Sequence, residues 1–268
     1  MKKKSSSIKE IIRDAKKGKM FILVDNKDRE NEGDLVVPAS KVNPKKINFM
    51  AMHGRGLICL ALTSKKVKKL NLPLMSSINK SRTQTAFTIS IESKKGISTG
   101  ISAYDRAKTI KVAIKPSSNK KDIVSPGHVF PLVAKNGGVL ERAGHTEASI
   151  DISKLAKLNP SAVICEVMNE DGTMARYNDL IPFAKKHKLK IARIEDLISY
   201  RLKNERLIKF ISNKKIKVKN FGNFDLKTFK SKLDGSEHYA ITKGKFNSNK
   251  SSRVRVISTN IFNSFFNF

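Results

Sequence analysis

The sequence predicts an α/β (α+β) fold: a layered sandwich in which helices flank a mixed β-sheet, followed by a short, partly β C-terminal segment. Apolar runs of strand length alternate irregularly with amphipathic helical stretches, as in layered domains. A hydrophobic content of 39% with only 8 prolines and 14 glycines is typical of a folded chain. The composition becomes rich in lysine and asparagine after residue 206, so we place one domain at 1–206 and a separate segment at 207–268.

Hydrophobic periodicity predicts the elements of the first half. Ile8, Ile11, Ile12 and Ala15 recur at helical spacing. The alternation of apolar and polar residues predicts a half-buried strand at 85–91. The remaining elements are a helix at 7–17, strands at 20–24, 35–39 and 57–62, a helix at 44–52, connections at 65–72 and 73–84, and a helix within 100–113.

The second half continues the same pattern. A Gly137-Gly138 turn ends one strand region, and the turn 169–172 follows another strand. The aromatic end at 260–268 has no strand or helical period, which indicates a truncated or docked segment. The expected elements are strands within 129–139 and at 162–168 and 190–192, helices at 146–158, 178–187 and 194–206, and short strand-like pieces after residue 207.

The formal net charge of +31 comes mostly from lysine, which outnumbers arginine 42 to 12. Many lysines fall in dispersed pairs, tryptophan is absent and tyrosine is rare. A nucleic-acid-binding protein more often gathers arginine and aromatic residues on one face. We therefore expect a lysine-rich solvated surface and no specific nucleic-acid partner, with nucleic-acid binding as the alternative.

The sequence also predicts a cytoplasmic protein without a membrane partner. No apolar run approaches the roughly 18 residues that span a bilayer. The basic start of the chain lacks the apolar core of a signal peptide, because Ile8-Lys9-Glu10 follows at once. Cys59 and Cys165 lie in apolar runs and are expected to be buried and reduced, and two cysteines exclude a four-thiolate zinc site.

An acidic segment, Asp28-Arg29-Glu30-Asn31-Glu32-Gly33-Asp34, follows the first predicted strand. Its alternate carboxylates, Glu30, Glu32 and Asp34, repel one another in a low dielectric unless cations neutralise them. Carboxylate oxygens are the ligands that Mg²⁺ and Mn²⁺ prefer. The segment therefore indicates a divalent-metal and substrate site; contacts to sugar hydroxyls and a solvated turn are the alternatives.

A second candidate site is Glu141-Arg142-Ala143-Gly144-His145-Thr146-Glu147, at a predicted helix start. Thr146 is a suitable N-cap, and backbone N–H groups at a helix start bind phosphate. Arg142 offers a bidentate partner for the same phosphate. His145 is a natural metal ligand or proton carrier, with a structural histidine as the alternative.

Other candidates are weaker when taken singly. His128 begins an apolar strand, and Glu166 lies within the apolar run 163–168. A buried glutamate has a raised pKa and suits acid–base work, whereas a solvated position on the sheet is the alternative. Segments 53–56 and 99–106 combine glycine with arginine. Each could approach a phosphate, and an ordinary turn is the alternative.

Together these motifs resemble the 3,4-dihydroxy-2-butanone 4-phosphate synthase family, a riboflavin-pathway enzyme that converts ribulose 5-phosphate into that product and formate. The resemblance covers roughly residues 8 to 202. It rests on motifs in the family's order: Asp28-Arg29-Glu30-Asn31-Glu32-Gly33-Asp34, His53-Gly54-Arg55-Gly56-Leu57-Ile58-Cys59, Thr99-Gly100-Ile101-Ser102, Pro126-Gly127-His128-Val129-Phe130-Pro131-Leu132, Arg142-Ala143-Gly144-His145-Thr146-Glu147, and Cys165-Glu166 with Asp171-Gly172-Thr173-Met174-Ala175-Arg176.

The resemblance implies a lyase that acts on D-ribulose 5-phosphate through an enediol and a skeletal rearrangement. It implies one or two Mg²⁺ (or Mn²⁺) ions per subunit and a homodimer with the active site at its interface. Glu30 and His145 match the family's metal ligands. The matching substrate-binding positions are Arg29, Glu30, Asp34, Arg142, Ala143, Gly144, His145, Thr146 and Glu166. The positions that match its catalytic or site-lining residues are His128, Glu166, Glu32 and Cys59.

The segment 207–268 resembles the opening strands of GTP cyclohydrolase II. Phe221-Gly222-Asn223-Phe224 and Leu233-Asp234-Gly235-Ser236-Glu237-His238-Tyr239-Ala240 carry this match. Where that family places its zinc-binding cysteines, this chain has none. The resemblance therefore implies a truncated, degenerate remnant without zinc and without cyclohydrolase activity.

Overall fold

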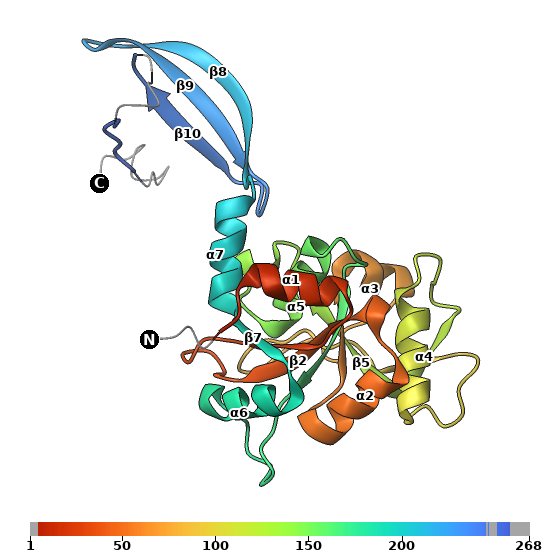
Figure 1. Cartoon of the computed structure of the whole chain (residues 1–268). Helices are drawn as coiled ribbons and strands as arrows, with labels where there is room; N and C mark the ends of the chain where they lie inside the picture. The colour runs from red at the N-terminus through yellow and green to blue at the C-terminus, as the bar shows by residue number, and fades with distance from the viewer. Residues whose placement is uncertain (1–4, 245, 247–250, 258–268) are drawn as a thin grey trace. The chain divides into compact units, whose positions relative to one another are not determined.

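The computed structural model describes residues 5–244, 246 and 251–257, which divide into two compact units (Figure 1). The first unit, Met1–Leu207, contains a seven-stranded mixed sheet flanked by helices. The second, Ile208–Phe268, contains a three-stranded sheet. The α/β class and the mixed, layered sheet are confirmed.

Seven strands form the sheet of the first unit in the order β4-β5-β3-β6-β2-β1-β7. β1 pairs in parallel with β7, and β3 with β5, whereas the other neighbours are antiparallel. The strands are β1 Phe21–Val24, β2 Gly33–Pro38, β3 Cys59–Thr63, β4 Ile91–Ser93, β5 Ile123–Ala134, β6 Ser161–Glu166 and β7 Lys190–Arg193.

Helices cover both faces of this sheet, which is why its central strands are apolar on both sides. Successive side chains of a strand point to opposite faces, so Ile22 packs in one core while Phe21 and Leu23 pack in the other. Figure 1 shows α1 and α5 on one side of the sheet and α2 and α6 on the other. The helices are α1 Ile8–Lys16, α2 Pro44–Phe49, α3 Ser64–Leu70, α4 Ala103–Ile114, α5 His145–Leu155, α6 Tyr177–His187 and α7 Ile194–Asn204.

Side-chain caps fix several helix starts close to the predicted positions. Ser7 accepts a hydrogen bond from the Glu10 amide, and Glu10 accepts one in return from the Ser7 amide at 2.9 Å. The Ser102 hydroxyl accepts the Asp105 amide at the start of α4. Asn43 caps α2, with Pro44 as its first residue.

Two predictions of local structure were wrong. The basic stretch 65–72, expected to be a connection, is mostly the helix α3, which buries Val67 and Leu70 between its lysines. The stretch 85–91, expected to be a strand, makes isolated bridges, and β4 begins only at Ile91. The neighbouring strand β5 contains Pro131, which has no N–H to continue a regular ladder.

The second unit is an antiparallel meander of β8 Ile208–Val218, β9 Gly222–Ser231 and β10 Glu237–Thr242. Its strands are exposed or half-buried throughout. The predicted strand-like pieces are therefore real strands, whereas the aromatic end 260–268 lies outside the described residues.

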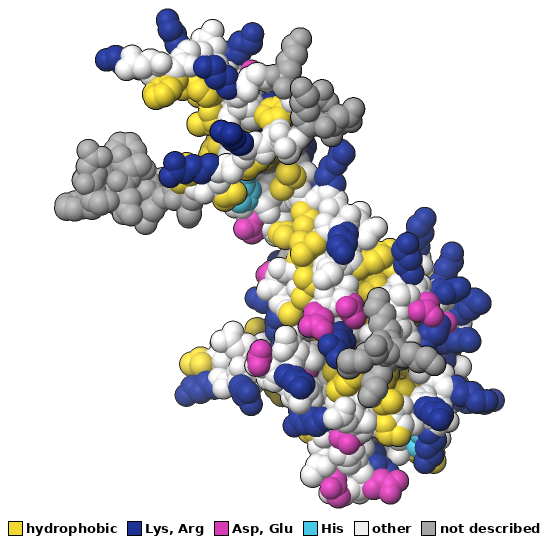
Figure 2. All heavy atoms as spheres, turned by 60° about the vertical axis from the view of Figure 1, so that its left-hand side comes forward, with side chains coloured by type: hydrophobic (Ala, Val, Ile, Leu, Met, Phe, Trp, Pro, Cys, Tyr) yellow, Lys and Arg dark blue, Asp and Glu magenta, His cyan; other side chains and the backbone are white. Residues whose placement is uncertain are grey.

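Lysine and arginine side chains are spread over the visible face rather than gathered in one patch (Figure 2). Both cysteines are buried and free, as expected. Among the described residues, no helix is both long and apolar enough to cross a membrane.

Candidate active site

A cavity of about 230 Å³ lies between the loop that joins β1 to β2, the start of α5 and strands β2, β3 and β6. It brings together residues that are more than a hundred positions apart in the chain. Its lining consists of Arg29, Glu30, Glu32, Asp34, Cys59, Ser81, Thr83, Thr85, Phe87, Leu132, Arg142, His145, Thr146, Ile164 and Glu166.

The acidic loop is shaped around Asp25, whose side chain is fully buried. One carboxylate oxygen of Asp25 accepts the Arg29 guanidinium at 2.8 Å and the Glu30 amide at 3.1 Å. The other accepts the Glu32 amide at 2.9 Å. These bonds fix the loop so that the Glu30 and Glu32 side chains reach the cavity. Arg29 also pairs with Glu30.

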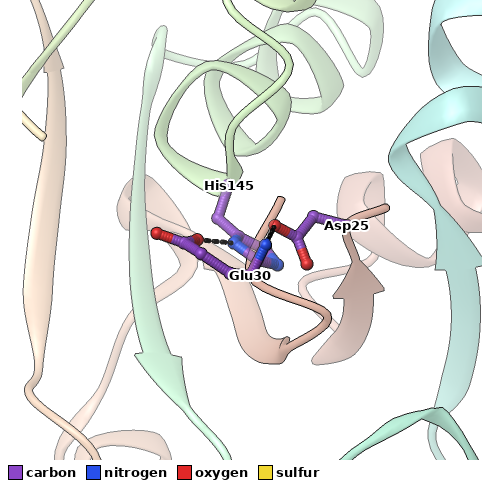
Figure 3. Close-up of side chains that lie close together, drawn as sticks. All are labelled: Asp25, Glu30 and His145. Carbon is purple, nitrogen blue, oxygen red and sulfur yellow. Dashed lines mark hydrogen bonds and ion pairs between the residues drawn. The ribbon is translucent and has the colours of Figure 1, made fainter. Parts of the chain in front are cut away.

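His145 is the first residue of α5 and faces the acidic loop (Figure 3). Its Nδ1 lies 3.8 Å from a carboxylate oxygen of Glu30 and 3.8 Å from one of Asp34. Burial alone lowers the pKa of His145, but the carboxylates of Asp34 and Glu30 outweigh it and raise the pKa to about 9. Its Nε2 is buried and has no hydrogen-bond partner among the described residues.

The pKa values of Glu30, Glu32 and Asp34 are shifted in different directions. The nearby His145 imidazole, with help from Arg29, lowers the pKa of Glu30 to about 2. Burial, together with the nearby Glu166, raises the pKa of Asp34 to about 7. Burial and the Glu30 charge also raise the pKa of Glu32. Two carboxylates of one cavity thus have pKa values shifted in opposite directions, downward for Glu30 and upward for Asp34.

The start of α5 points backbone N–H groups, which can bind an anion, toward one side of the cavity. Gly144 is the N-cap and makes no side-chain hydrogen bond, so the expected cap at Thr146 was wrong; Thr146 is the second helical residue and lines the cavity. The first backbone N–H groups of a helix have no intrahelical partner and favour negative charge. Arg142 lines the same end of the cavity, while its Nη1 donates to buried Glu147 at 2.7 Å.

Arg142 also organises the loop that closes the cavity. Its Nη2 donates to the Thr83 carbonyl at 2.9 Å and to the Thr85 hydroxyl at 3.0 Å. These two threonines thereby become part of the cavity wall. Ala143 does not line the cavity, and neither does Gly144, where an added Cβ would come within 2.9 Å of Glu147.

Glu166 lies at the end of β6, directly opposite Asp34 in the β2–β6 register. It is half-buried, and its Oε2 accepts the Leu57 amide at 2.8 Å. The segment 53–56 thus supports Glu166: Gly56 lies so close that an added Cβ would be 2.5 Å from Oε2. Of the two expectations for Glu166, the structure shows a partly buried carboxylate with a backbone partner.

Cys59 and His128 occupy different positions relative to the cavity. Cys59 begins β3 and lines it, and burial together with Glu166 raises the pKa of its thiol well above the usual range. The thiol is therefore a neutral wall group. His128 lies on β5, is 44% exposed and pairs with Glu92. It is not among the residues that line the cavity of this chain.

The sequence interpretation missed several residues of the site. Asp25 directly follows a buried strand. Its place shortly before Arg29 and Glu30 is the one feature of the sequence that could have indicated a role in the site. Ser81 and Thr83 lie in the stretch 73–84, which was expected to be a loop, and Thr85 lies at the start of the predicted strand 85–91; no pattern distinguished them as site residues.

The donor set fits a hard divalent cation. Asp25, Glu30 and His145 each offer one ligand atom within 4.8 Å of the others (Figure 3). Carboxylate oxygens with one imidazole suit Mg²⁺ or Mn²⁺, and the orphaned Nε2 of His145 shows that this ring has unused coordinating capacity.

Comparisons with known proteins identify the family. Residues 9–200 match the family 3,4-dihydroxy-2-butanone 4-phosphate synthase, and residues 209–268 match GTP cyclohydrolase II. A protein of Photobacterium phosphoreum named for the synthase is 52% identical over 94% of this chain and 69% of its own length. The riboflavin biosynthesis protein RibBA of Aquifex aeolicus is 50% identical over 98% of this chain and 66% of its own length. The chain thus spans about two thirds of these relatives.

Solved structures are similar as well. A two-domain 3,4-dihydroxy-2-butanone 4-phosphate synthase from A. baumannii superposes with a TM-score of 0.82 at 48% identity, covering 89% of this chain and 70% of that one. A synthase in complex with two magnesium ions gives a TM-score of 0.71 at 36% identity, covering 74% of this chain and 98% of that one. The chain therefore belongs to the 3,4-dihydroxy-2-butanone 4-phosphate synthase family, lyases of riboflavin biosynthesis, and continues into part of a GTP cyclohydrolase II domain.

Proposed function

We propose that this chain converts D-ribulose 5-phosphate into L-3,4-dihydroxy-2-butanone 4-phosphate and formate with a divalent cation. The observation that carries the proposal is the meeting of Glu30, Asp34, His145 and Glu166 in one cavity with a helix start and Arg142. Glu30 and His145 would hold Mg²⁺ or Mn²⁺, and a second ion has carboxylates available beside them. The similar synthase solved in complex with two magnesium ions supports a divalent-cation site in this family.

Different residues of the cavity would bind the phosphate and transfer protons. The α5 N–H groups, Thr146 and Arg142 would bind the phosphate. A bound divalent cation polarises substrate oxygens and acidifies the neighbouring C–H. The carboxylates of the cavity, Glu32, Asp34 or Glu166, would accept and return the protons that enediol formation and rearrangement require.

Glu30→Gln tests the metal site directly. The amide keeps the shape of the side chain but removes the charge that pairs with His145, so metal-dependent formate release should fall at least about a hundredfold. Asp28→Asn is the matched control, because Asp28 is an exposed acid of the same segment that does not line the cavity. Wild-type turnover of the Glu30 variant would refute the assignment.

We infer in addition that the active form is a homodimer in which His128 serves the site of the second copy. His128 matches an essential position of the family, yet it does not line its own cavity, and it is exposed on β5. In a two-fold dimer a residue outside its own site is available to its partner's.

Mixed dimers of Glu30→Gln and His128→Gln chains test this arrangement. If His128 acts across the interface, one site of each mixed dimer has both native residues, and activity returns. If His128 acts within its own chain, both sites carry a defect and the mixture stays inactive, which would contradict the inference. Sedimentation of the mixture gives the oligomeric state.

The segment 207–268 supplies no thiolate for a zinc site, because the chain's two cysteines are Cys59 and Cys165. We therefore propose that this chain lacks GTP cyclohydrolase II activity. Incubation with GTP and Zn²⁺ should release no pyrophosphate; its release would overturn the proposal.

A further inference from the structure

Arg176 joins a distant segment to the acidic loop. It is the N-cap of α6 and ends the motif 171–176, to which the proposed reaction gives no role. Its Nη1 donates to the carbonyl of Glu30 at 2.6 Å and to the carbonyl of Asn31 at 2.9 Å. The same nitrogen lies 3.5 Å from a carboxylate oxygen of Glu32.

These contacts complete the anchoring of the loop. Asp25 holds the loop through N–H groups of Glu30 and Glu32. Among the described residues, Arg176 is the group that holds the carbonyls of Glu30 and Asn31. Asn31 has a φ of +56°, a left-handed conformation that asparagine adopts more readily than most residues and that turns its carbonyl and that of Glu30 toward Arg176.

We propose that Arg176 is a positioning residue that locks the acidic loop in the geometry in which Glu30 and Glu32 face the cavity. One nitrogen of the rigid, planar guanidinium, Nη1, makes both carbonyl hydrogen bonds and lies near the carboxylate, and a lysine ammonium on a flexible stem is held in such a position less well. Its backbone amide is fixed in turn by Asp179 at 2.9 Å, so the start of α6 is the rigid support. The proposal rests on the proposed metal site and deepens it.

Charge alone predicts the opposite effect on metal binding. Arg176 places a cation beside Glu30 and Glu32, and a cation repels Mg²⁺ or Mn²⁺. A purely electrostatic role therefore means that Arg176→Gln binds metal more tightly. A positioning role means that it binds metal more weakly, because the ligand-bearing loop is no longer held.

Two measurements on the full-length chain separate these roles. The first is hydrogen exchange of the metal-free protein, followed at the amides of Glu30, Asn31 and Glu32, which are all hydrogen-bonded inside the loop. The second is titration with Mn²⁺ alone, followed by electron paramagnetic resonance. Both are made on Arg176→Gln, Arg176→Lys and the control Arg193→Gln.

Arg193 is a matched control for several reasons. It is also a helix N-cap that pairs with a glutamate, at 2.9 Å, and its side chain is 46% exposed against 45% for Arg176. It lies over the Tyr177 ring, at the first residue of α6, so its removal reports any general disturbance there.

We expect Arg176→Gln to lose about tenfold in loop amide protection and about tenfold in Mn²⁺ affinity. Arg176→Lys should be intermediate, and Arg193→Gln should equal the wild type. Unchanged loop protection, or equal or tighter Mn²⁺ binding in Arg176→Gln, overturns the proposal. If Arg176→Gln does not fold, wild-type values for Arg176→Lys overturn it. If the wild-type chain does not bind Mn²⁺, the proposed metal site is refuted. Hydrogen exchange of the metal-free protein still tests whether Arg176 holds the acidic loop in place.

Discussion

Asp25 organises the acidic loop without being exposed to the solvent. Its two oxygens accept three hydrogen bonds, from the Arg29 guanidinium and the amides of Glu30 and Glu32. Because one of its oxygens also lies within 4.8 Å of a candidate ligand atom of Glu30 and of His145, Asp25 links the shape of the loop to its affinity for a cation.

Asp25→Asn should therefore weaken Mn²⁺ binding at least about tenfold, since an amide nitrogen cannot accept the N–H groups that one carboxylate oxygen now receives. Asp14→Asn is the control, because Asp14 is also buried and pairs with Lys190 at 3.1 Å, away from the cavity. Titration with Mn²⁺ checks the prediction. Wild-type affinity in Asp25→Asn would show that the loop holds its shape without this carboxylate.

Position 56 must be glycine because Glu166 lies too close to it for a side chain. In Gly56→Ala the new Cβ would lie 2.5 Å from Glu166 Oε2 and 2.6 Å from its carbonyl oxygen, so Glu166 must leave the Leu57 amide. We expect kcat for formate release to fall at least about tenfold.

Gly172→Ala provides the comparison for this change. Gly172 has a φ of +86° and open space around it, so alanine there costs about 1 kcal/mol in strain without touching Glu166. Stability should fall and kcat should not. Equal kcat values for the two variants would argue against the role of Gly56.

Helices and strands with a strong local signal could be predicted from the sequence, whereas those shaped by neighbours could not. The start of α1 follows from Ser7 and Glu10, whose mutual hydrogen bonds need no distant partner. The helix α3 was missed because two buried apolar residues among lysines give little periodicity. The 85–91 region alternates like a strand, but Pro131 and the contacts of Thr85 with Arg142 decide its conformation.

The helix α4 stabilises one face of the sheet through its buried side. Ile110 is fully buried there, whereas Lys111 next to it is exposed. Ile110→Ala should lower the free energy of unfolding by about 2–5 kcal/mol, and Lys111→Ala by no more than about 0.5 kcal/mol. Denaturation of both variants measures the difference. A loss below about 1 kcal/mol for Ile110→Ala would contradict the described packing.

At the scale of the whole molecule, the first unit contains all residues of the candidate site and both large cores. The sequence predicted the two segments around Glu30 and His145 separately, each as a site for a cation or phosphate. It did not place Asp25, because nothing in the pattern distinguishes a buried acid that accepts N–H groups from an ordinary loop residue, nor Thr83, whose position depends on its distant contact with Arg142. Only the resemblance to the synthase family, and not the hydrophobic periodicity, predicted that the segments around Glu30 and His145 form one site.

The second unit should be dispensable for the reaction. A chain ending at Arg206 keeps α7 and every residue of the cavity. We expect it to release formate at the rate of the full chain under the same conditions. A loss of activity together with an unchanged free energy of unfolding would show that residues 207–268 contribute to the site.

We propose that the cavity holds a divalent cation on which the breakdown of ribulose 5-phosphate depends. Formate release by the full chain, measured with Mg²⁺ and again with excess EDTA, tests it most directly. We predict steady release with Mg²⁺, none with EDTA, and recovery when Mg²⁺ is restored. Undiminished release in EDTA, or none with Mg²⁺, would contradict the assignment of Glu30 and His145.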